Sequence, residues 1–314
     1  MMLPVRGDQA VQGARSYRIF GLSIQSEIVL SDLDEVQAEG PADVVIRIGP
    51  VPRLLDGEEP HGLSVVADGA ILNIVTAARY WIRGGSEIVV EPCSGATARN
   101  LRLFLLGSAF GAILHQRGLL PLHANAVEID GRAIAFMGHS GAGKSTLAAW
   151  FHDRGFKILA DDVCVVRIED GKVLAHAGIP RLRLWKDALE RTGRTAEEFE
   201  ASFDDAEKYN VPTRSRPSGE SIELSHLYLL SKPQDGGAVI ERLQGIEAVD
   251  ALVANTYRGR YVPLMGQTQH HLRQCLALVG KVAVFRAQRV WGMEGFDQQA
   301  KLLEQHARAF LEQR

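Results

Sequence analysis

One stretch of the chain, AIAFMGHSGAGKST at Ala133–Thr146, restricts the fold more than any other. It contains the pattern G-x-x-x-x-G-K-[ST] without a substitution, and the apolar run Ala133–Met137 in front of it is typical of a buried strand. Glycines in such a loop let successive backbone N–H groups point at one anion, while the lysine ammonium reaches the β- and γ-phosphates of a nucleotide. A glycine-rich turn can also simply connect a strand to a helix without binding a ligand. The complete pattern between strand and helix favours nucleotide binding.

The residues after this loop predict a helix that directs its positive end at the same anion. Leu147, Ala148 and Phe151 are spaced to form its buried side, and Gly155 is placed to end it. The Ser145 hydroxyl is the Mg²⁺ ligand that the pattern predicts. We expect the loop and the start of the helix to bind ATP through Gly138, His139, Ser140, Gly141, Ala142, Gly143, Lys144, Ser145 and Thr146.

The net charge and the cysteine content indicate which classes of partner and which cellular compartment to expect. The 314-residue chain has a formal net charge of −3, which argues against a general binder of nucleic acids or anionic membranes. Its three cysteines are scattered and show no disulfide or zinc spacing. The N-terminus lacks the apolar segment of a signal peptide, and the longest apolar run, Leu103–Leu114, is too short to cross a bilayer. We expect a cytoplasmic protein without nucleic-acid or membrane partners, and a homo-oligomer is left open.

The first part of the chain is predicted to be rich in β-structure. Arg79, Trp81 and Arg83 alternate with apolar neighbours, and we interpret them as one exposed face of a sheet. A helix is expected over Ala96–Gln116, followed by a boundary near Arg117-Gly118. We therefore predict an N-terminal β-rich α+β domain at 1–116 and a second domain at 117–314. The expected strands and turns include Val44–Ile48, Leu63–Ala67, Asp68-Gly69, Ala70–Val75, Gly84-Gly85 and Glu87–Val90.

A hairpin is predicted immediately before the glycine-rich loop. Asp130-Gly131 is a strong two-residue turn signal between two apolar runs. With this turn, the strand that enters the loop has an antiparallel neighbour, and continuing the register places His123 opposite Gly138. The histidine would then lie beside the phosphates. A histidine at a strand end can equally have a purely structural role.

A second polar pair follows the strand predicted at Phe156–Ala160. Asp161 and Asp162 stand at its carboxyl end, where α/β sheets bind their ligands. Phosphoryl transfer needs one carboxylate for Mg²⁺ and one for proton handling, and consecutive residues of a strand point to opposite sides. We therefore expect different roles for the two acids. The alternative is that one of them is an ordinary turn residue or helix cap.

The rest of the chain is predicted more coarsely. A hairpin through Asp170-Gly171 is followed by a helix over Leu184–Gly193 and a short acidic helix that Thr195 caps. Residues 204–221 are polar and predicted to form a mobile loop whose cations, including Lys208, Arg214 and Arg216, can hold phosphates or an acidic substrate, or be merely solvated. The adjacent His270-His271 pair lacks metal-site spacing. Strands are expected at 227–230, 238–243 and 282–285, and helices at 246–257, 267–279 and 296–313.

Residues 122–163, LHANAVEIDGRAIAFMGHSGAGKSTLAAWFHDRGFKILADDV, resemble the catalytic domain of the HPr kinase/phosphorylase family. The family's features stand here as His123, Gly138–Ser145, Arg154-Gly155 and Ala160-Asp161-Asp162. The resemblance implies an α/β P-loop domain of the HPr-kinase/PEP-carboxykinase-like type. It also implies the roles of five residues: Asp161 takes the proton of a substrate serine, His123 lies against the phosphates and Asp161, Lys144 neutralises the transferred group, and Ser145 binds Mg²⁺ with Asp162 nearby.

The chain also departs from that family. Thr146 stands where the bifunctional enzymes typically carry Glu, the Glu-x-Arg-Gly signature is not apparent in GIPRLRLW at 178–185, and a PGRN-like segment is missing. The run LLGSAFGAILHQRGLLPLHANAV is more similar to HPr-kinase-related proteins of lasso-peptide biosynthesis. Those proteins resemble serine kinases that modify a precursor peptide.

The expected function is that of an ATP- and Mg²⁺-dependent serine kinase. Its acceptor would be a serine hydroxyl of a peptide or small protein, such as a lasso-type precursor peptide. Two alternatives stay open: an HPr(Ser) kinase/phosphorylase, and a nucleotide-dependent regulatory module without transfer activity. Asp161 separates enzyme from module, because a module has no use for a base beside the phosphates.

Overall fold

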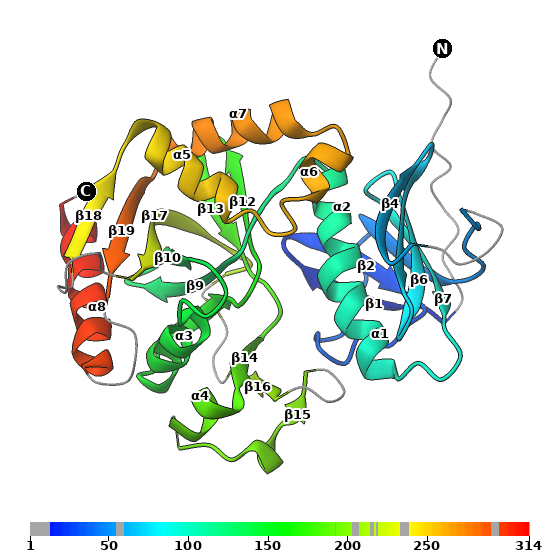
Figure 1. Cartoon of the computed structure of the whole chain (residues 1–314), viewed down its shortest axis with the longest axis horizontal. Helices are drawn as coiled ribbons and strands as arrows, with labels where there is room; N and C mark the ends of the chain where they lie inside the picture. The colour runs from blue at the N-terminus through cyan, green and yellow to red at the C-terminus, as the bar shows by residue number, and fades with distance from the viewer. Residues whose placement is uncertain are drawn as a thin grey trace. The chain divides into compact units, whose positions relative to one another are not determined.

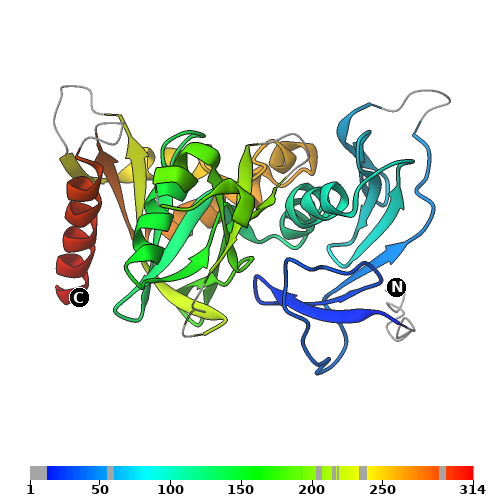
Figure 2. The ribbon, with the colours of Figure 1, turned by 90° about the horizontal axis from the view of Figure 1, so that it is seen from below.

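The structure is a computed structural model that describes residues 13–54, 60–191, 193–202, 207–213, 217, 219–232, 239–289 and 295–313. The chain is a mixed α/β protein with several sheets. It divides into two compact units, Met1–Arg117 and Gly118–Arg314, which Figures 1 and 2 show as ribbons. None of the described helices is long and apolar enough to span a membrane.

The described strands of the first unit form one seven-stranded sheet in the order β1-β2-β3-β7-β6-β5-β4. The hairpins predicted at Asp68-Gly69 and Gly84-Gly85 are present, because β4 pairs with β5 and β6 pairs with β7 in antiparallel fashion. The strands are β1 Arg15–Ile19, β2 Leu22–Ser26, β3 Val44–Ile48, β4 Gly62–Val66, β5 Gly69–Ile74, β6 Ala78–Arg83 and β7 Glu87–Pro92.

One helical segment follows this sheet. It consists of α1 (Ala98–Phe104), a π-helical turn (Leu105–Ala109) and α2 (Phe110–Gln116), where a single helix from Ala96 was predicted. The start is two residues later because the Thr97 side chain caps α1 by accepting the Asn100 N–H. The Tyr80 hydroxyl of β6 donates a 2.9 Å hydrogen bond to the Leu101 carbonyl, which fixes the segment to the sheet.

The interpretation of Arg79 as part of an exposed face is wrong. Its side chain is 5% exposed, and its guanidinium donates to the Val51 carbonyl at 2.7 Å and to Glu91 at 2.6 Å. A buried cation is tolerated there because its charge and its donors are matched. Alternation along a strand shows which side chains share a face. It does not show that the segment at Val51 covers this part of the face.

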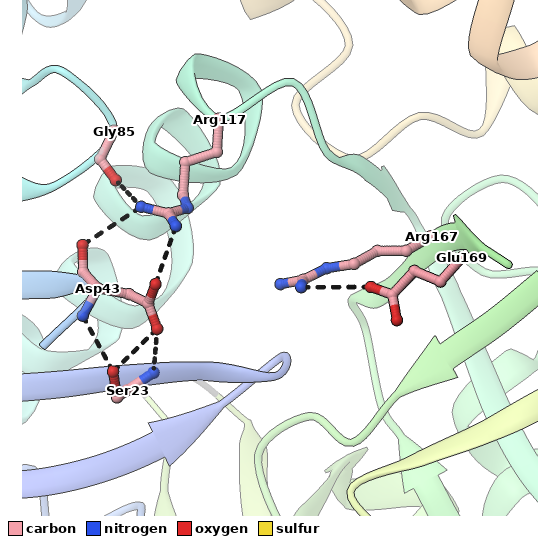
Figure 3. Close-up of polar contacts among 6 residues, drawn as sticks. All are labelled: Ser23, Asp43, Gly85, Arg117, Arg167 and Glu169. Atoms are coloured by element: carbon pink, nitrogen blue, oxygen red, sulfur yellow. Dashed lines mark hydrogen bonds and ion pairs between the residues drawn. The ribbon is translucent and has the colours of Figure 1, made fainter. Parts of the chain in front are cut away.

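One arginine, Arg117, secures the end of α2, as Figure 3 shows. Arg117 donates to the Asp43 carboxylate and to the Gly85 carbonyl, both at 3.0 Å. The other oxygen of Asp43 accepts the Ser23 amide and hydroxyl. The same view draws an ion pair of the second unit, between Arg167 and Glu169.

The second unit is built around β10, the strand that enters the glycine-rich loop. β10 lies between β9, which is antiparallel to it, and β17, which is parallel. The sheet order is β11-β9-β10-β17-β13-β12-β8, with β19 also on β17 and β18 on β19. Its strands are β8 Leu120–Leu122, β9 Ala124–Ile129, β10 Arg132–Met137, β11 Lys157–Ala160, β12 Cys164–Glu169, β13 Lys172–His176, β17 Ser221–Ser231, β18 Val239–Leu243 and β19 Ala283–Gln288.

Helices cover both faces of this sheet (Figure 1). Ile134 and Phe136 of β10 share a core with residues of α3 and α8, whereas Ala133 and Ala135 share the opposite core with residues of α5 and α7. A strand buried on both faces is apolar throughout, which is why Ala133–Met137 has no polar residue. The longer helices are α3 Lys144–Asp153, α5 Gly245–Ala254, α7 Thr268–Val279 and α8 Phe296–Glu312, with the short α6 Tyr261–Leu264 before α7.

Several elements of this unit were predicted correctly. The turn at Asp130-Gly131 joins β9 and β10 in the predicted register, with Val127 opposite Ile134 and Asn125 opposite Phe136. The hairpin through Asp170-Gly171 joins β12 and β13. Leu147, Ala148 and Phe151 are buried, and α3 ends before Gly155, whose φ is 84°.

The segment after β13 differs from its prediction. A strand, β14 (Arg181–Trp185), precedes α4 (Lys186–Arg191), where a helix from Leu184 was predicted. The alternating burial is that of a strand, because Leu182 and Leu184 are fully buried while Arg183 between them is not. The acidic helix is only a 3₁₀ turn, Ala196–Glu198, and the Thr195 side chain does not cap it.

The polar loop predicted at 204–221 also contains a strand. β16 (Lys208–Pro212) pairs with β14 and with β15 (Glu200–Ala201) in a small three-stranded sheet, and β17 already begins at Ser221. The strand β16 was not recognised because its sequence is mostly polar. Only Val211, opposite Leu182 of β14, is buried. Arg214 and Arg216 lie outside the described residues.

Candidate functional site

The glycine-rich loop, residues 138–143, joins β10 to α3. The Lys144 side chain, 7% exposed, folds back over the loop and donates to the carbonyls of Gly138 at 2.6 Å and His139 at 3.2 Å. α3 begins with Gly143 in the left-handed conformation, and no side chain caps it. Its first backbone N–H groups therefore remain available to an anion, which the helix dipole favours at this end.

Two glycines of the loop combine a positive φ with a close approach of another part of the chain. A Cβ at Gly138 would lie 2.9 Å from the Leu230 carbonyl oxygen, and one at Gly143 would lie 2.1 Å from the guanidinium of Arg289. Gly141 differs from both, since a Cβ there would meet no atom within 4 Å. The loop is thus pressed onto β17 and Arg289 on one side and open around Gly141.

His123 lies at this end of the sheet, but not in the predicted pair with Gly138. The pairing of β9 with β10 ends at Ala124 and Met137, and the His123 amide donates to the Asn255 carbonyl at 2.6 Å. The Gly138 carbonyl accepts the Lys144 ammonium instead. The two groups that the predicted pair would have joined are thus bonded to Asn255 and Lys144.

The imidazole of His123 contacts Asp162. Its Nδ1 lies 3.0 Å from the Asp162 carbonyl oxygen and 3.4 Å from a carboxylate oxygen of the same residue. Burial lowers the pKa of His123, and the charges of Lys144 and Lys208 add to this effect against the opposing charge of Asp162. A neutral ring whose Nδ1 faces a carbonyl carries its proton there, so Nε2 is left as an acceptor.

Asp161 is buried directly after β11, and both of its oxygens are held. Oδ1 accepts the Asn125 side-chain amide and Oδ2 accepts the Arg183 backbone N–H, each at 2.6 Å. Burial raises the pKa of Asp161 to about 6, and the charge of Asp162 contributes in the same direction, while the Arg183 N–H opposes it. The result is an oriented carboxylate that is mainly ionised at neutral pH and still more basic than an ordinary aspartate.

Asp162 has different partners, as expected for the second acid. Its backbone is left-handed, with φ 72°, and its carboxylate is 3.2 Å from Arg183 and 3.4 Å from His123. Burial acts to raise the pKa of Asp162, but the positive charges led by Arg183 outweigh it, so the pKa is lowered. Asp162 is therefore a persistent anion beside the loop, whereas Asp161 is a readily protonated one.

Two further cations belong to this site. Arg183 was overlooked because no strand was predicted before the helix expected from Leu184, and Lys208 was placed in a mobile loop. Burial lowers the pKa values of Lys144 and Lys208, and both feel the charges of Asp161 and Asp162. Alternation in RLRLW was the signal that could have revealed the strand that brings Arg183 here.

The structure thus brings together most of the predicted residues. Lys144 lies within electrostatic range of His123, Asp161 and Asp162, and the loop lies directly before Lys144. Ser145 and Thr146 stand half-exposed in the first turn of α3, and His139 and Ser140 are exposed in the loop. Among the described residues, no group of three or more His, Cys, Asp or Glu side chains is arranged to hold a metal ion.

Comparisons with known proteins add little to this geometry. No protein-family model matches the chain, and no curated protein matches it. Among solved structures, the chain is similar to the HPr(Ser) kinase/phosphatase from Coxiella burnetii, with 14% sequence identity and a TM-score of 0.34 over 62% of this chain and 97% of that chain. This is a distant similarity.

Proposed function

We propose that this protein is an ATP- and Mg²⁺-dependent serine kinase that transfers the γ-phosphate to a serine hydroxyl of a peptide or small protein. The observation that carries the proposal is Asp161. A buried carboxylate, oriented at both oxygens and with a pKa near 6, stands in the same electrostatic cluster as Lys144. A protein that only binds a nucleotide has no need of such a base.

The residues around the loop fit ATP and Mg²⁺. The backbone N–H groups around Gly141 and the uncapped start of α3 can bind phosphate oxygens, with Lys144 as their counter-charge. Mg²⁺ is commonly held by one or two protein oxygens together with substrate phosphates, which Ser145 and Asp162 can supply without a larger acidic group. When bound, the metal neutralises charge on the phosphates.

The roles of the chain's own groups then follow. Asp161 accepts the proton as the serine oxygen bonds to the γ-phosphorus and the bond from that phosphorus to the ADP oxygen breaks. Asn125 and the Arg183 amide hold the receiving carboxylate in place, and Lys144 stabilises charge on the transferred group. His123, neutral and hydrogen-bonded through Nδ1 to the Asp162 carbonyl oxygen, holds the backbone of Asp162 in place.

The acceptor and the two alternatives remain proposals. On sequence resemblance alone, we propose a lasso-type precursor peptide as the acceptor to test first. HPr is the second acceptor to test, and an absence of transfer to any acceptor would favour a regulatory module. We also propose a cytoplasmic location and a homo-oligomeric state.

The test is the variant Asp161→Asn, which preserves size and removes the basic carboxylate. We expect ATP affinity to stay near that of the wild type, while transfer of labelled γ-phosphate falls by about a hundredfold or more, the usual worth of general base catalysis. Asp170→Asn is the matched control, because Asp170 is an exposed turn residue with φ 48° that asparagine also tolerates. Full transfer by Asp161→Asn would rule out the proposed base.

A further inference from the structure

The seven-stranded sheet of the first unit has two edge strands, β1 and β4, and their outer sides differ. The outer side of β1 is covered, because Tyr17 forms a β-bridge with Glu35 and the Val36 amide donates to the Ser16 carbonyl at 2.9 Å. Along β4, no segment among the described residues forms such a bridge. Within the described part of the chain, the sheet is therefore closed at one edge and open at the other.

The open strand β4 also lacks the features that usually keep a sheet edge from pairing with another strand. Its sequence, GLSVV, has no charged residue and no proline, and its register with β5 runs without a bulge from the pair Gly62–Asn73 to the pair Val66–Gly69. Val65 is an exposed apolar side chain at a position where edge strands often carry lysine. An edge of this kind pairs readily with a further strand.

The hairpin of β4 and β5 decides which backbone groups point outward. Its loop has two residues, so Val66 and Gly69 exchange both of their backbone hydrogen bonds. Such pairs alternate along antiparallel strands, so Ser64 also bonds to β5, whereas Leu63 and Val65 direct their N–H and C=O groups away from it. No other described residue forms a backbone hydrogen bond with these outward groups. Two donors and two acceptors are thus available at the edge.

These groups are complementary to a second copy of the same strand. When two β4 strands run antiparallel with Ser64 opposite Ser64, Leu63 of each copy lies opposite Val65 of the other. Both of these pairs are of the hydrogen-bonded kind, so the two strands use every outward N–H and C=O group. A twofold axis through the Ser64 pair relates the copies, as in an isologous dimer.

The side chains of β4 suit this partner as well. By register Leu63 lies beside Leu72 and Val65 beside Ala70, and both residues of β5 are fully buried. Leu63 and Val65 thus continue an apolar face of the sheet, yet Val65 is 48% exposed where this face ends. A second copy covers it with an apolar cross-strand pair. Asp68 falls opposite a proline, so no like charges meet along the paired strands.

We propose that β4 is the interface of a homodimer in which the seven-stranded sheets of two copies of this chain join edge to edge, antiparallel and centred on Ser64. An extended peptide from another protein would meet the same donors and acceptors, but β4 has no charged side chain to select it. A second copy always supplies the matching strand. The interface lies in the first unit alone, so the inference does not depend on the proposed kinase function.

Analytical ultracentrifugation of the full chain over a range of concentrations tests the proposal. Two short strands bury little surface, so the dimer should be weak and its share should rise with concentration. Val65→Lys places a charge at the edge and should weaken self-association by about tenfold or more. Val75→Lys makes the same change at a 67% exposed valine in the turn between β5 and β6, and should leave self-association unchanged. A monomer at every concentration, or equal effects of the two substitutions, would overturn the proposal.

A mixing experiment tests the pairing through a gain of association. Leu63→Glu and Val65→Lys should each dimerise poorly, because each homodimer sets two charges against apolar side chains. In a mixed dimer the glutamate of one copy lies opposite the lysine of the other, and the second pair keeps its native residues. The mixture should therefore associate more tightly than either variant, which a misfolded protein does not do. No gain on mixing two variants that thermal melting shows to be folded would overturn the proposal.

A cross-link locates the paired strand directly. Ser64 faces its own copy in a non-hydrogen-bonded pair, where Cα atoms are about 4.5 Å apart and within the range of a disulfide. Ser64→Cys should therefore form a covalent dimer when oxidised glutathione is added, whereas Ser86→Cys, at an exposed turn residue before β7, should not. The wild type, with its three native cysteines, sets the background. Equal cross-linking of the two variants would mean that the copies meet elsewhere, and would overturn the proposal.

Discussion

The guanidinium of Arg289 donates a 2.6 Å hydrogen bond to the carbonyl of Ala142, near the end of the glycine-rich loop. Arg289 is 6% exposed, and its Nε has no hydrogen-bond partner among the described residues. The Ala142 carbonyl and the Gly143 N–H belong to one planar trans peptide and point in opposite directions. Arg289 therefore turns the Gly143 N–H away from itself, toward the side where the loop is open.

This contact predicts that Arg289 tunes nucleotide binding. Arg289→Met removes the donor and keeps an unbranched side chain, so the loop peptide is free to rotate. We expect ATP affinity, measured by calorimetry with Mg²⁺, to fall by about tenfold, the worth of a hydrogen bond from a charged donor. Arg289→Lys should restore part of it. Unchanged affinity in Arg289→Met would show that the loop holds its shape without this contact.

A second prediction concerns Gly143, which faces the same arginine. Gly143→Ala introduces a Cβ 2.1 Å from the guanidinium at a φ of 78°, so it combines a clash with backbone strain. We expect the free energy of unfolding in urea to fall by about 2 kcal/mol or more. Adding Arg289→Ala should recover only the part due to the clash, because the left-handed φ remains unfavourable. Complete recovery in the double variant would mean that strain at this φ contributes nothing.

The loop lysine supports a third prediction. Lys144→Ala removes the cation that lies over the Gly138 and His139 carbonyls. Calorimetric titration with ATP and Mg²⁺ should show binding weakened by about a hundredfold or more, since the phosphates lose their main counter-charge. Lys172→Ala, on an exposed hairpin, serves as the control. The phosphate-binding role of the loop would be refuted by equal affinities in the two variants.

The pH dependence of stability supplies a fourth prediction, at His176 of β13. Burial lowers the pKa of His176 from its usual 6.5 to about 4, and the charge of Arg167 acts in the same direction. Between these values the unfolded chain binds a proton that the folded protein excludes, so the free energy of unfolding falls as the pH drops. At neutral pH this contribution vanishes, because the ring is uncharged in both states.

His176→Leu should remove this effect. Urea unfolding at neutral pH and near pH 4 should show a smaller acid-induced loss for the variant, by about 1–3 kcal/mol. Neither ring nitrogen has a hydrogen-bond partner among the described residues, so an apolar replacement leaves no donor or acceptor stranded. Parallel pH dependences of wild type and variant would contradict the lowered pKa.

Several parts of the site were predictable from local sequence. The turn at Asp130-Gly131 needs left-handed residues, and once it forms, the pairing from Ile129–Arg132 to Ala124–Met137 follows by counting. The strand–loop–helix unit was predictable for the same reason, because its turn residues and its apolar spacing lie within some twenty residues of the sequence. The different partners of Asp161 and Asp162 were also expected, since they are neighbours in the chain.

Only the tertiary structure decided what surrounds these residues. Asn125, Arg183 and Lys208 approach Asp161 and Asp162 through pairings between distant segments, and Arg289 reaches the loop from the end of β19. β16 is too polar to be recognised as a strand, and it exists because Val211 and the leucines of β14 are covered by α3. The failed pair of His123 and Gly138 has the same origin. Local turn chemistry set the register, but beyond Ala124 and Met137 the His123 amide bonds to the Asn255 carbonyl and the Gly138 carbonyl accepts the Lys144 ammonium.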